Sequence, residues 1–244
     1  MTGDDGMKYK SSCIFRWFFL GFYLLILVPL LSGCTTARPK ADLSYTDDSV
    51  AESFSSNVSL SYVISNQSIS GSGVLMFRKP DQIRAVILSP FGSVLQEVYV
   101  HGEQLSIIDA GNGTAFNGSY MDLPGKGTFS GWRNIHWLFD VDPPDSSRRF
   151  AAFERINKYG HQEKAVFEKG LLVSKTTVEG DFVSYGKYST VKGVAFPLEI
   201  IYKTIENEKF TILFEEPEIN VSFADGAFSV DLSKYRVYPL SVLR

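Results

Sequence analysis

Apolar and polar residues alternate along most of the chain after residue 53, which is the pattern of half-buried β-strands. In the clearest example Val194, Phe196, Leu198, Ile200 and Tyr202 share one face of a strand, and polar residues lie between some of them. Such segments recur about every ten residues, between turns rich in Gly, Pro, Asn and Asp. We expect strands over residues 54–64, 69–77, 83–88, 94–100, 104–109, 114–120, 149–155, 164–168, 171–178, 181–188, 194–204 and 210–220.

One segment departs from the alternation. Trp132, Ile135, His136 and Phe139 are spaced at i, i+3, i+4 and i+7, so they fall on one face of a helix. Ser130 is a suitable N-cap, and two prolines end the segment shortly after residue 139. The spacing predicts a short helix of about two turns within an otherwise β chain.

The spacing of the strands indicates the fold class. Ten or eleven short strands at hairpin spacing favour a single open antiparallel β-barrel, and they argue against a βαβ arrangement. The short helix would serve as a lid over this mainly β fold. We find no internal repeat and no second domain boundary, so residues 53–244 are expected to form one domain.

The first 33 residues have the features of a secretory signal peptide. Basic residues precede an apolar run over residues 17–31, which is shorter than the ~20 residues that a spanning helix needs. Leu31-Ser32-Gly33-Cys34 follows and resembles the lipobox of bacterial lipoproteins, in which cleavage leaves Cys34 as the first residue with diacylglycerol on its thiol. The alternative is an uncleaved anchor with an incidental cysteine. Translation could start at Met1 or at Met7.

Lipidation of Cys34 would fix the location of the protein. Two or three acyl chains anchor a protein to a membrane almost permanently, whereas a single chain binds only marginally. In the lipoprotein sorting rule an Asp after the acylated cysteine favours the inner membrane, and Thr35 stands there instead. We therefore expect the periplasmic face of the outer membrane. Residues 34–52 lack periodicity and are expected to form a flexible tether.

The sequence contains little that indicates catalysis. A net charge of -3 gives no basic surface for nucleic acid, and no G-x-S-x-G motif surrounds a serine. The three histidines are scattered, so no His/Cys metal site can be assembled. Asp140, Asp142 and Asp145 are better explained as solvated loop residues than as a cation site. The sequence predicts no enzyme, no cofactor and no metal.

Aromatic residues make up 14% of the chain, and they gather on the apolar faces of the strands. One explanation is an ordinary packed core. The other is that a curved sheet with a helical lid encloses more space than its own side chains fill, as in barrels that hold an apolar ligand.

A resemblance to a known family favours the second explanation. Residues 71–81 read Gly-x-Gly-x-Leu-x-Phe-Arg-x-Pro-Asp, and Ile83-Arg84 and Ser89-Pro90-Phe91-Gly92-Ser93 follow. With the segment 131–144, these motifs resemble LolB, the outer-membrane lipoprotein that accepts other lipoproteins from the soluble carrier LolA. The resemblance covers residues 54–144, whereas residues 228–243 have no counterpart in that family.

The resemblance implies a relay of acyl chains in which no bond is made or broken. It implies lipoprotein acyl chains as ligand, a soluble periplasmic carrier as donor, and Phe91 as the apolar tip of a membrane-insertion loop. A tethered monomer is the simplest assembly. The expected cavity lining is Leu75, Phe77, Ile83, Val98, Phe196, Leu198, Ile200, Phe210 and Phe214, with Trp132, Ile135 and Phe139 from the lid.

Two other functions stay open. The protein could be an envelope assembly lipoprotein whose sheet is filled by its own side chains and binds a protein partner along an edge strand. It could also carry a different lipid, which would change only the cargo.

Overall fold

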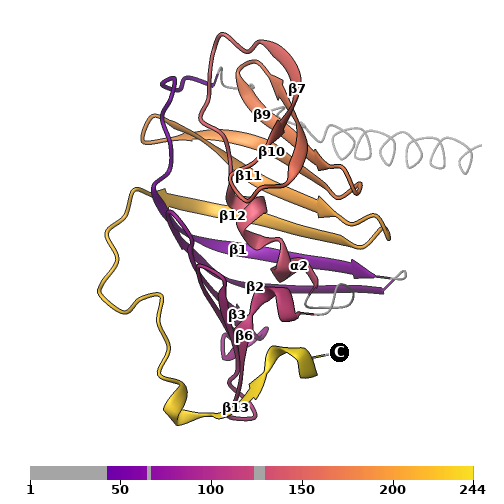
Figure 1. The fold of residues 1–244 in the computed structure, drawn as a ribbon. Helices are drawn as coiled ribbons and strands as arrows, with labels where there is room; N and C mark the ends of the chain where they lie inside the picture. The colour runs from indigo at the N-terminus through magenta and orange to yellow at the C-terminus, as the bar shows by residue number, and fades with distance from the viewer. Residues whose placement is uncertain (1–42, 65–66, 124–129, 244) are drawn as a thin grey trace, which may run out of the picture. The chain divides into compact units, whose positions relative to one another are not determined.

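The computed structural model describes residues 43–64, 67–123 and 130–243 (Figure 1). The predicted signal peptide, Cys34 and the first part of the predicted tether lie outside these residues. The described residues belong to one compact unit, Leu43–Arg244. This unit contains the whole hydrophobic core of the described chain, so it is the part that we expect to fold by itself.

A single sheet of 13 strands forms most of the unit. Six strands precede the lid and seven follow it; β1–β6 and β7–β12 each form a meander of antiparallel hairpins, and β13 returns to pair with β6. The two groups join where β1 pairs with β12, near the middle of the sheet (Figure 1). The strands are β1 (Ser53–Ile64), β2 (Gln67–Arg78), β3 (Gln82–Leu88), β4 (Val94–His101), β5 (Gln104–Asp109), β6 (Thr114–Ser119), β7 (Phe150–Ile156), β8 (Gln162–Glu168), β9 (Leu171–Thr177), β10 (Phe182–Val191), β11 (Val194–Lys203), β12 (Lys209–Ile219) and β13 (Arg236–Pro239).

The predicted fold class is confirmed: the unit is mainly β, with one open, strongly curved sheet and few helices. All twelve segments that the sequence marked as strands are present, and the sheet has a thirteenth, so it has more strands than the ten or eleven expected of the barrel. This strand, β13, pairs in parallel with β6, whereas every other recorded pair is antiparallel. Its four residues are all exposed, so the alternation that identified the other strands is missing here.

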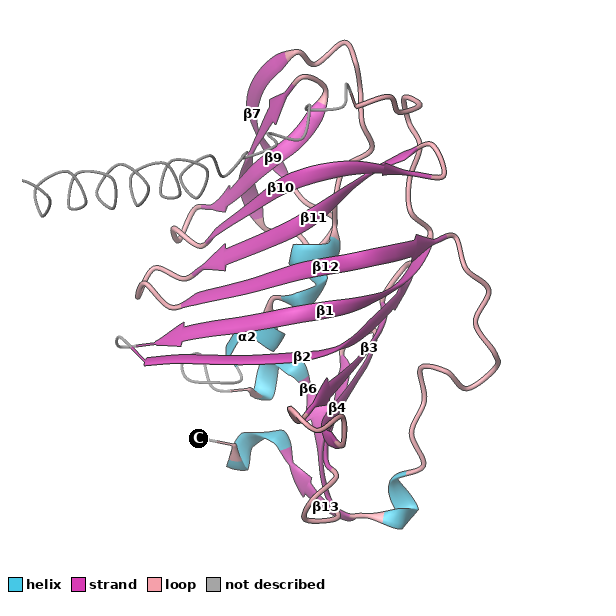
Figure 2. Ribbon diagram, turned by 180° about the vertical axis from the view of Figure 1, so that it is seen from behind, coloured by secondary structure: helices cyan, strands magenta, loops and turns pink. Residues whose placement is uncertain are grey.

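The lid consists of two short helices instead of one. α2 (Ser130–Arg133) and α3 (Ile135–Phe139) are separated by Asn134, whose φ of -107° and ψ of 15° interrupt the helical backbone. Figure 2 shows these helices against one face of the curved sheet. Every residue of α3 is buried, because the helix is covered by the sheet and by the connections around it.

The main hydrophobic core lies on this concave face, between the sheet and α3. Alternate residues of the strands point into it, as the period of two requires. A smaller cluster lies on the opposite face, where Tyr99, Ile108 and Ala115 are covered by the C-terminal segment. That segment then adds β13 to the sheet edge and returns Leu240 to the main core.

Candidate functional site

Five phenylalanine rings meet where the sheet and the lid come together. Phe54 of β1 is at the centre, and its ring centroid lies 5.2 to 5.7 Å from those of Phe77, Phe139, Phe196 and Phe214. The five rings come from β1, β2, α3, β11 and β12, so the cluster ties the two halves of the sheet to the lid. Most of the pairs are tilted or edge-to-face, which is a favourable geometry for aromatic rings.

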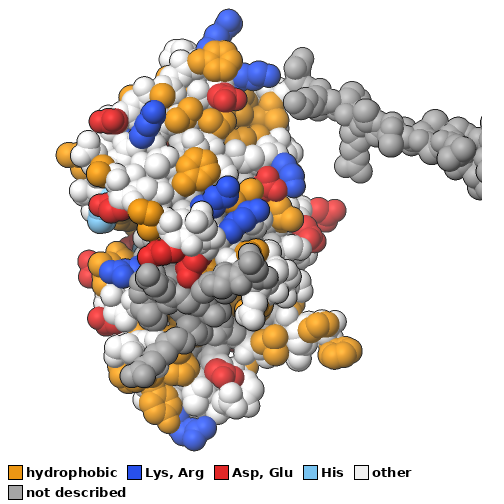
Figure 3. All heavy atoms as spheres, turned by 90° about the vertical axis from the view of Figure 1, so that its right-hand side faces the viewer, with side chains coloured by type: hydrophobic (Ala, Val, Ile, Leu, Met, Phe, Trp, Pro, Cys, Tyr) orange, Lys and Arg blue, Asp and Glu red, His pale blue; other side chains and the backbone are white. Residues whose placement is uncertain are grey.

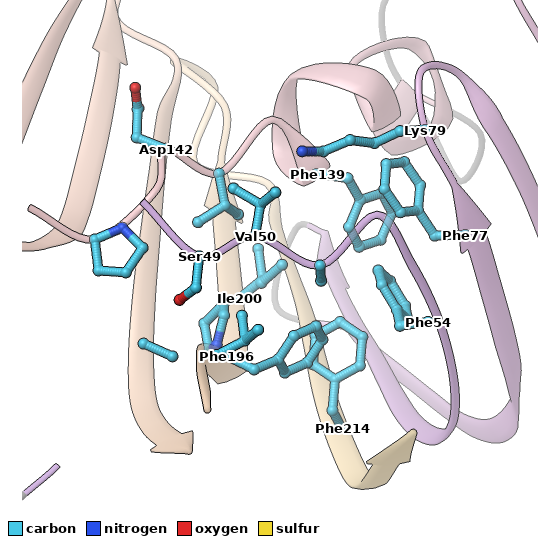
Figure 4. A pocket seen from close by; sticks show the side chains of 16 residues that line it. Ser49, Val50, Phe54, Phe77, Lys79, Phe139, Asp142, Phe196, Ile200 and Phe214 are labelled. Carbon is cyan, nitrogen blue, oxygen red and sulfur yellow. The ribbon is translucent and has the colours of Figure 1, made fainter. Parts of the chain in front are cut away.

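A small apolar cavity of about 50 Å³ adjoins this aromatic cluster (Figure 4). The five rings line one side of it, together with Ile200. The chain that precedes β1 lines the other side with Ser49, Val50 and Ala51. Ligand sites are usually about 300–1,000 Å³, and an apolar cavity that binds benzene is about 150 Å³, so this cavity is closed to an acyl chain in the present conformation.

The structure brings the predicted lining residues together on the concave face. Seven of the nine are buried in the main core, and the other two, Leu198 and Phe210, are partly buried and pack against it. Phe77, Phe196, Phe214 and Ile200 line the cavity itself. The buried seven are Leu75, Phe77, Ile83, Val98, Phe196, Ile200 and Phe214.

The three predicted lid residues lie at different places along the lid and have different neighbours. Phe139 belongs to the aromatic cluster and lines the cavity. Trp132 lies near Phe210 instead, with ring centroids 6.4 Å apart. Ile135 is buried in the main core. The cavity wall therefore contains only the C-terminal end of the lid.

The C-terminal end of α3 is fixed to the sheet by two buried side chains. Lys175 of β9 is fully buried, and its Nζ donates to the carbonyl oxygens of Trp137, at 2.6 Å, and Asp140, at 2.8 Å. The Tyr185 hydroxyl donates to the carbonyl oxygen of Leu138 at 3.0 Å. The last carbonyls of a helix have no partner within it, so these donors satisfy groups that would otherwise be buried unpaired.

A third buried side chain, Glu163 of β8, binds the lid through Trp137. Its carboxylate accepts hydrogen bonds from the indole nitrogen of Trp137 at 2.5 Å, from Arg155 at 2.7 Å and from Asn157 at 3.2 Å. Burial alone would raise the pKa of Glu163, but the Trp137 hydrogen bond and the charge of Lys175 hold that pKa below its ordinary value. Glu163 is therefore ionised beside the buried ammonium group.

The loop carboxylates also have partners. Arg155 binds Asp142 through two nitrogens, at 2.5 and 2.7 Å, and Lys158 pairs with Asp140 at 2.8 Å. His136 of α3 bonds to the carbonyl oxygen of Gly102 through Nε2 at 2.8 Å. Burial lowers the pKa of His136, so its imidazole is neutral at pH 7. These groups fasten the lid and the loop after it.

A second pocket, of about 380 Å³, lies on the other side of the lid. Its walls combine tyrosines, Trp137, Met121 and Ile205 with charged and amide side chains, and none of the predicted lining or lid residues faces it. A wall of this composition does not suit an alkyl chain. The cavity at the aromatic cluster is the one that the predicted lining residues share.

Phe91 lies at the tip of the β3–β4 turn, and its side chain is 97% exposed. It does not fold back onto the sheet. The Ser89 hydroxyl accepts hydrogen bonds from the backbone N–H groups of Phe91, at 3.2 Å, and Ser93, at 3.1 Å, and Gly92 adopts a φ of +81°. The hydrogen bonds fix the turn, and the ring points outward into solvent.

Sequence reasoning missed two contributors to the site. Phe54 is on the same strand face as Val58, so the alternation could have identified it. Lys175 gave no local signal, because a lysine among serine and threonine in a strand reads as a solvent-facing residue. Only the fold shows that it lies under the lid.

Over the face that Figure 3 shows, hydrophobic side chains are interspersed with charged and polar ones. No helix in the described part of the chain combines the length and the apolar composition needed to cross a bilayer.

The comparisons with known proteins show the fold but no close relative. Neither a protein-family model nor a curated protein matches the sequence. A DUF1329 family protein from Desulfovibrio piger superposes with a TM-score of 0.52 and 12% identity, over 74% of this chain and 90% of that one. A domain from Vibrio parahaemolyticus, provisionally assigned to outer membrane lipoprotein sorting, superposes with a TM-score of 0.51 and 5% identity, over 75% and 91%.

These similarities establish the class of fold. The chain has a LolA/LolB-like fold, as its motifs predicted. Sequence identities of 5 and 12% show a shared fold but not a shared function. The function therefore has to be argued from the residues of this chain.

The buried ammonium group gives a testable pH dependence. Burial lowers the pKa of Lys175 to about 8, below the ~10.4 of an unfolded chain. Between these values the unfolded state binds more protons, so the free energy of unfolding should rise with pH. We expect wild type to gain about 2 kcal/mol relative to Lys175→Met from pH 8 to 10, measured by urea unfolding.

At pH 7 the Lys175→Met variant should be less stable than wild type by about 3 kcal/mol, because the lid carbonyls and Glu163 lose their partner. Lys164→Met on β8, where the lysine is exposed, is the matched control and should change neither stability nor its pH slope. Parallel pH curves for wild type and Lys175→Met would contradict the assigned role.

Proposed function

We propose that the protein is a bacterial outer-membrane lipoprotein that holds acyl chains between its concave sheet and its lid. It would pass those chains, with the lipoprotein that carries them, into the membrane. The observation that carries the proposal is the aromatic cluster, whose rings line one side of the apolar cavity where the lid meets the sheet. The LolA/LolB-like fold supports the same reading.

The energetics define what such a site must do. An acyl chain of sixteen carbons in water is unfavourable by roughly 12 kcal/mol, at about 0.8 kcal/mol per CH₂. A carrier needs a continuous apolar surface to replace the bilayer during transfer. The aromatic cluster and the nearby Leu75, Ile83 and Val98 offer that surface once the rings move apart. The chain would then be released downhill into lipid.

The present conformation is the closed one in this proposal. The cavity of about 50 Å³ must expand severalfold to admit an acyl chain.

Attachment and delivery would use two other features. Cys34, in the predicted lipobox, would hold the protein at the periplasmic face of the outer membrane as a monomer. The exposed ring of Phe91 would enter the headgroup region, where an aromatic side chain binds with little loss of conformational freedom. The donor would be a soluble periplasmic carrier.

The closely packed aromatic core also fits a second function, a platform that binds a partner protein. If the rings never part, the protein is an assembly platform that binds a partner protein. Its edge strand β7 would be the contact surface, since Phe150 is 78% and Ile156 74% exposed there.

Native mass spectrometry of residues 42–244, purified from a bacterial periplasm without detergent, separates these functions. We expect co-purified acylated molecules, together with displacement of a fluorescent fatty acid by unlabelled fatty acid. The mass of the bound species would distinguish lipoprotein cargo from another lipid. A clean apo mass without probe binding would contradict the carrier function and leave the platform.

Phe91→Glu tests delivery separately from binding. Burying a phenylalanine is worth about 1.5–3 kcal/mol, so the variant should transfer a bound fluorescent acyl probe to liposomes at least tenfold more slowly. Its affinity for the probe should not change, because Phe91 lies far outside the core.

Two controls accompany this variant. Phe91→Leu keeps an apolar tip and should transfer normally. Val178→Glu places the same charge at another exposed apolar position, 68% exposed, and should also transfer normally. Normal transfer by Phe91→Glu would remove the loop from the mechanism.

A further inference from the structure

The chain before β1 is attached to one end of the domain. Residues 43–51, here called the N-terminal strap, come from the stretch that we expected to be a flexible tether. The Thr46 N–H donates to the carbonyl oxygen of Gly193 at 3.0 Å, and the Asp48 N–H donates to that of Pro144 at 2.9 Å. The Tyr45 hydroxyl donates to the carbonyl oxygen of Lys169 at 2.6 Å. The strap therefore bridges the β10–β11 turn, the loop after the lid and the β8–β9 turn.

The last residues of the strap close the apolar cavity. Figure 4 shows the chain with Ser49 and Val50 passing directly beside the cavity, which Phe196 and Ile200 also line. Ala51 completes this wall. Without these three residues the aromatic cluster would face solvent at this end of the sheet.

The strap is held much less firmly than the lid. None of its nine residues is buried, and most of its hydrogen bonds to the domain are exposed to water. The lid, in contrast, is fixed by the buried groups of Lys175, Tyr185 and Glu163. Segments with few buried apolar contacts and exposed hydrogen bonds are the first to detach in local unfolding.

We infer that the N-terminal strap is the gate of the acyl cavity, an inference that rests on the proposed function. The strap leaves first, and the space between Val50 and the aromatic cluster becomes the entrance for an alkyl chain. The chain from Cys34 to Leu43 spans at most about 30 Å when extended. A strap so close to a lipidated residue places the entrance near the membrane surface to which the cargo is delivered.

A reversible disulfide tests the gate. The Asp47 carboxylate accepts hydrogen bonds from the N–H and the hydroxyl of Ser146, at 3.1 and 2.5 Å, so these two side chains already meet. In residues 42–244 the variant Asp47→Cys/Ser146→Cys would contain only the two introduced cysteines. Loss of free thiol reports that the disulfide has formed, and circular dichroism reports that the fold is intact.

The measurement is the rate of uptake of cis-parinaric acid by the oxidised and the reduced double variant. We expect oxidation to slow uptake at least tenfold and reduction to restore the wild-type rate. The two single variants should be insensitive to oxidant. A variant that begins at Glu52 lacks the strap and should take up the probe faster than wild type.

Two results would overturn the inference, and they can be told apart. Equal uptake by the oxidised and reduced forms, with binding intact, would exclude the strap as the gate and leave the proposed function standing. Absence of probe binding in every form, including the strap-free variant, would overturn the proposed function and the gate with it.

Discussion

The site depends on fixing a five-residue helix, which is too short to be stable by itself, against the concave face of the sheet. Lys175 and Tyr185 do this by donating to the carbonyl groups at and just beyond the end of α3, and Glu163 binds the indole of Trp137. A buried charge is costly unless it has compensating partners. Here the Glu163 carboxylate pairs with Arg155, and the Lys175 ammonium group donates to two carbonyl oxygens. Because α3 is held at this position, Phe139 reaches Phe54, Phe77 and Phe214 of the sheet and lines the apolar cavity with them.

The lid and the N-terminal strap both cover the aromatic cluster, but the lid is attached more firmly. This difference determines from which side a ligand can enter. The lid is anchored by buried polar groups, whereas the N-terminal strap is anchored at exposed turns. An apolar ligand would therefore enter beside the strap more easily than beneath α3. The second pocket, with its tyrosines and charged groups, lies on the other side of the lid and contributes polar surface instead. The same physical rule, burial of the anchoring groups, accounts for both the rigid and the mobile parts of the site.

Local patterns predicted the strands well, because alternation and turn chemistry are properties of neighbouring residues. The turn at Phe91 could be located in this way, although only the structure shows that its ring is exposed. The break at Asn134 could not be predicted, since its side chain bonds to the Tyr202 hydroxyl at 2.6 Å, far away in sequence. The burial of Lys175 and the pairing of β13 could not be predicted either, because both depend on contacts between residues far apart in sequence. A buried lysine and an exposed strand contradict the usual pattern, and only long-range packing explains them.

The central claim is that an acyl chain binds between α3 and the aromatic cluster. The most direct test is methyl NMR of residues 42–244 with a fatty acid that carries a nitroxide spin label. Ile200 lines the cavity, whereas Ile108 is just as deeply buried in the cluster on the opposite face of the sheet. The account predicts that the spin label broadens the methyl signals of Ile200 and spares those of Ile108. Equal broadening of both, or broadening only at exposed positions such as Ile156, would contradict it.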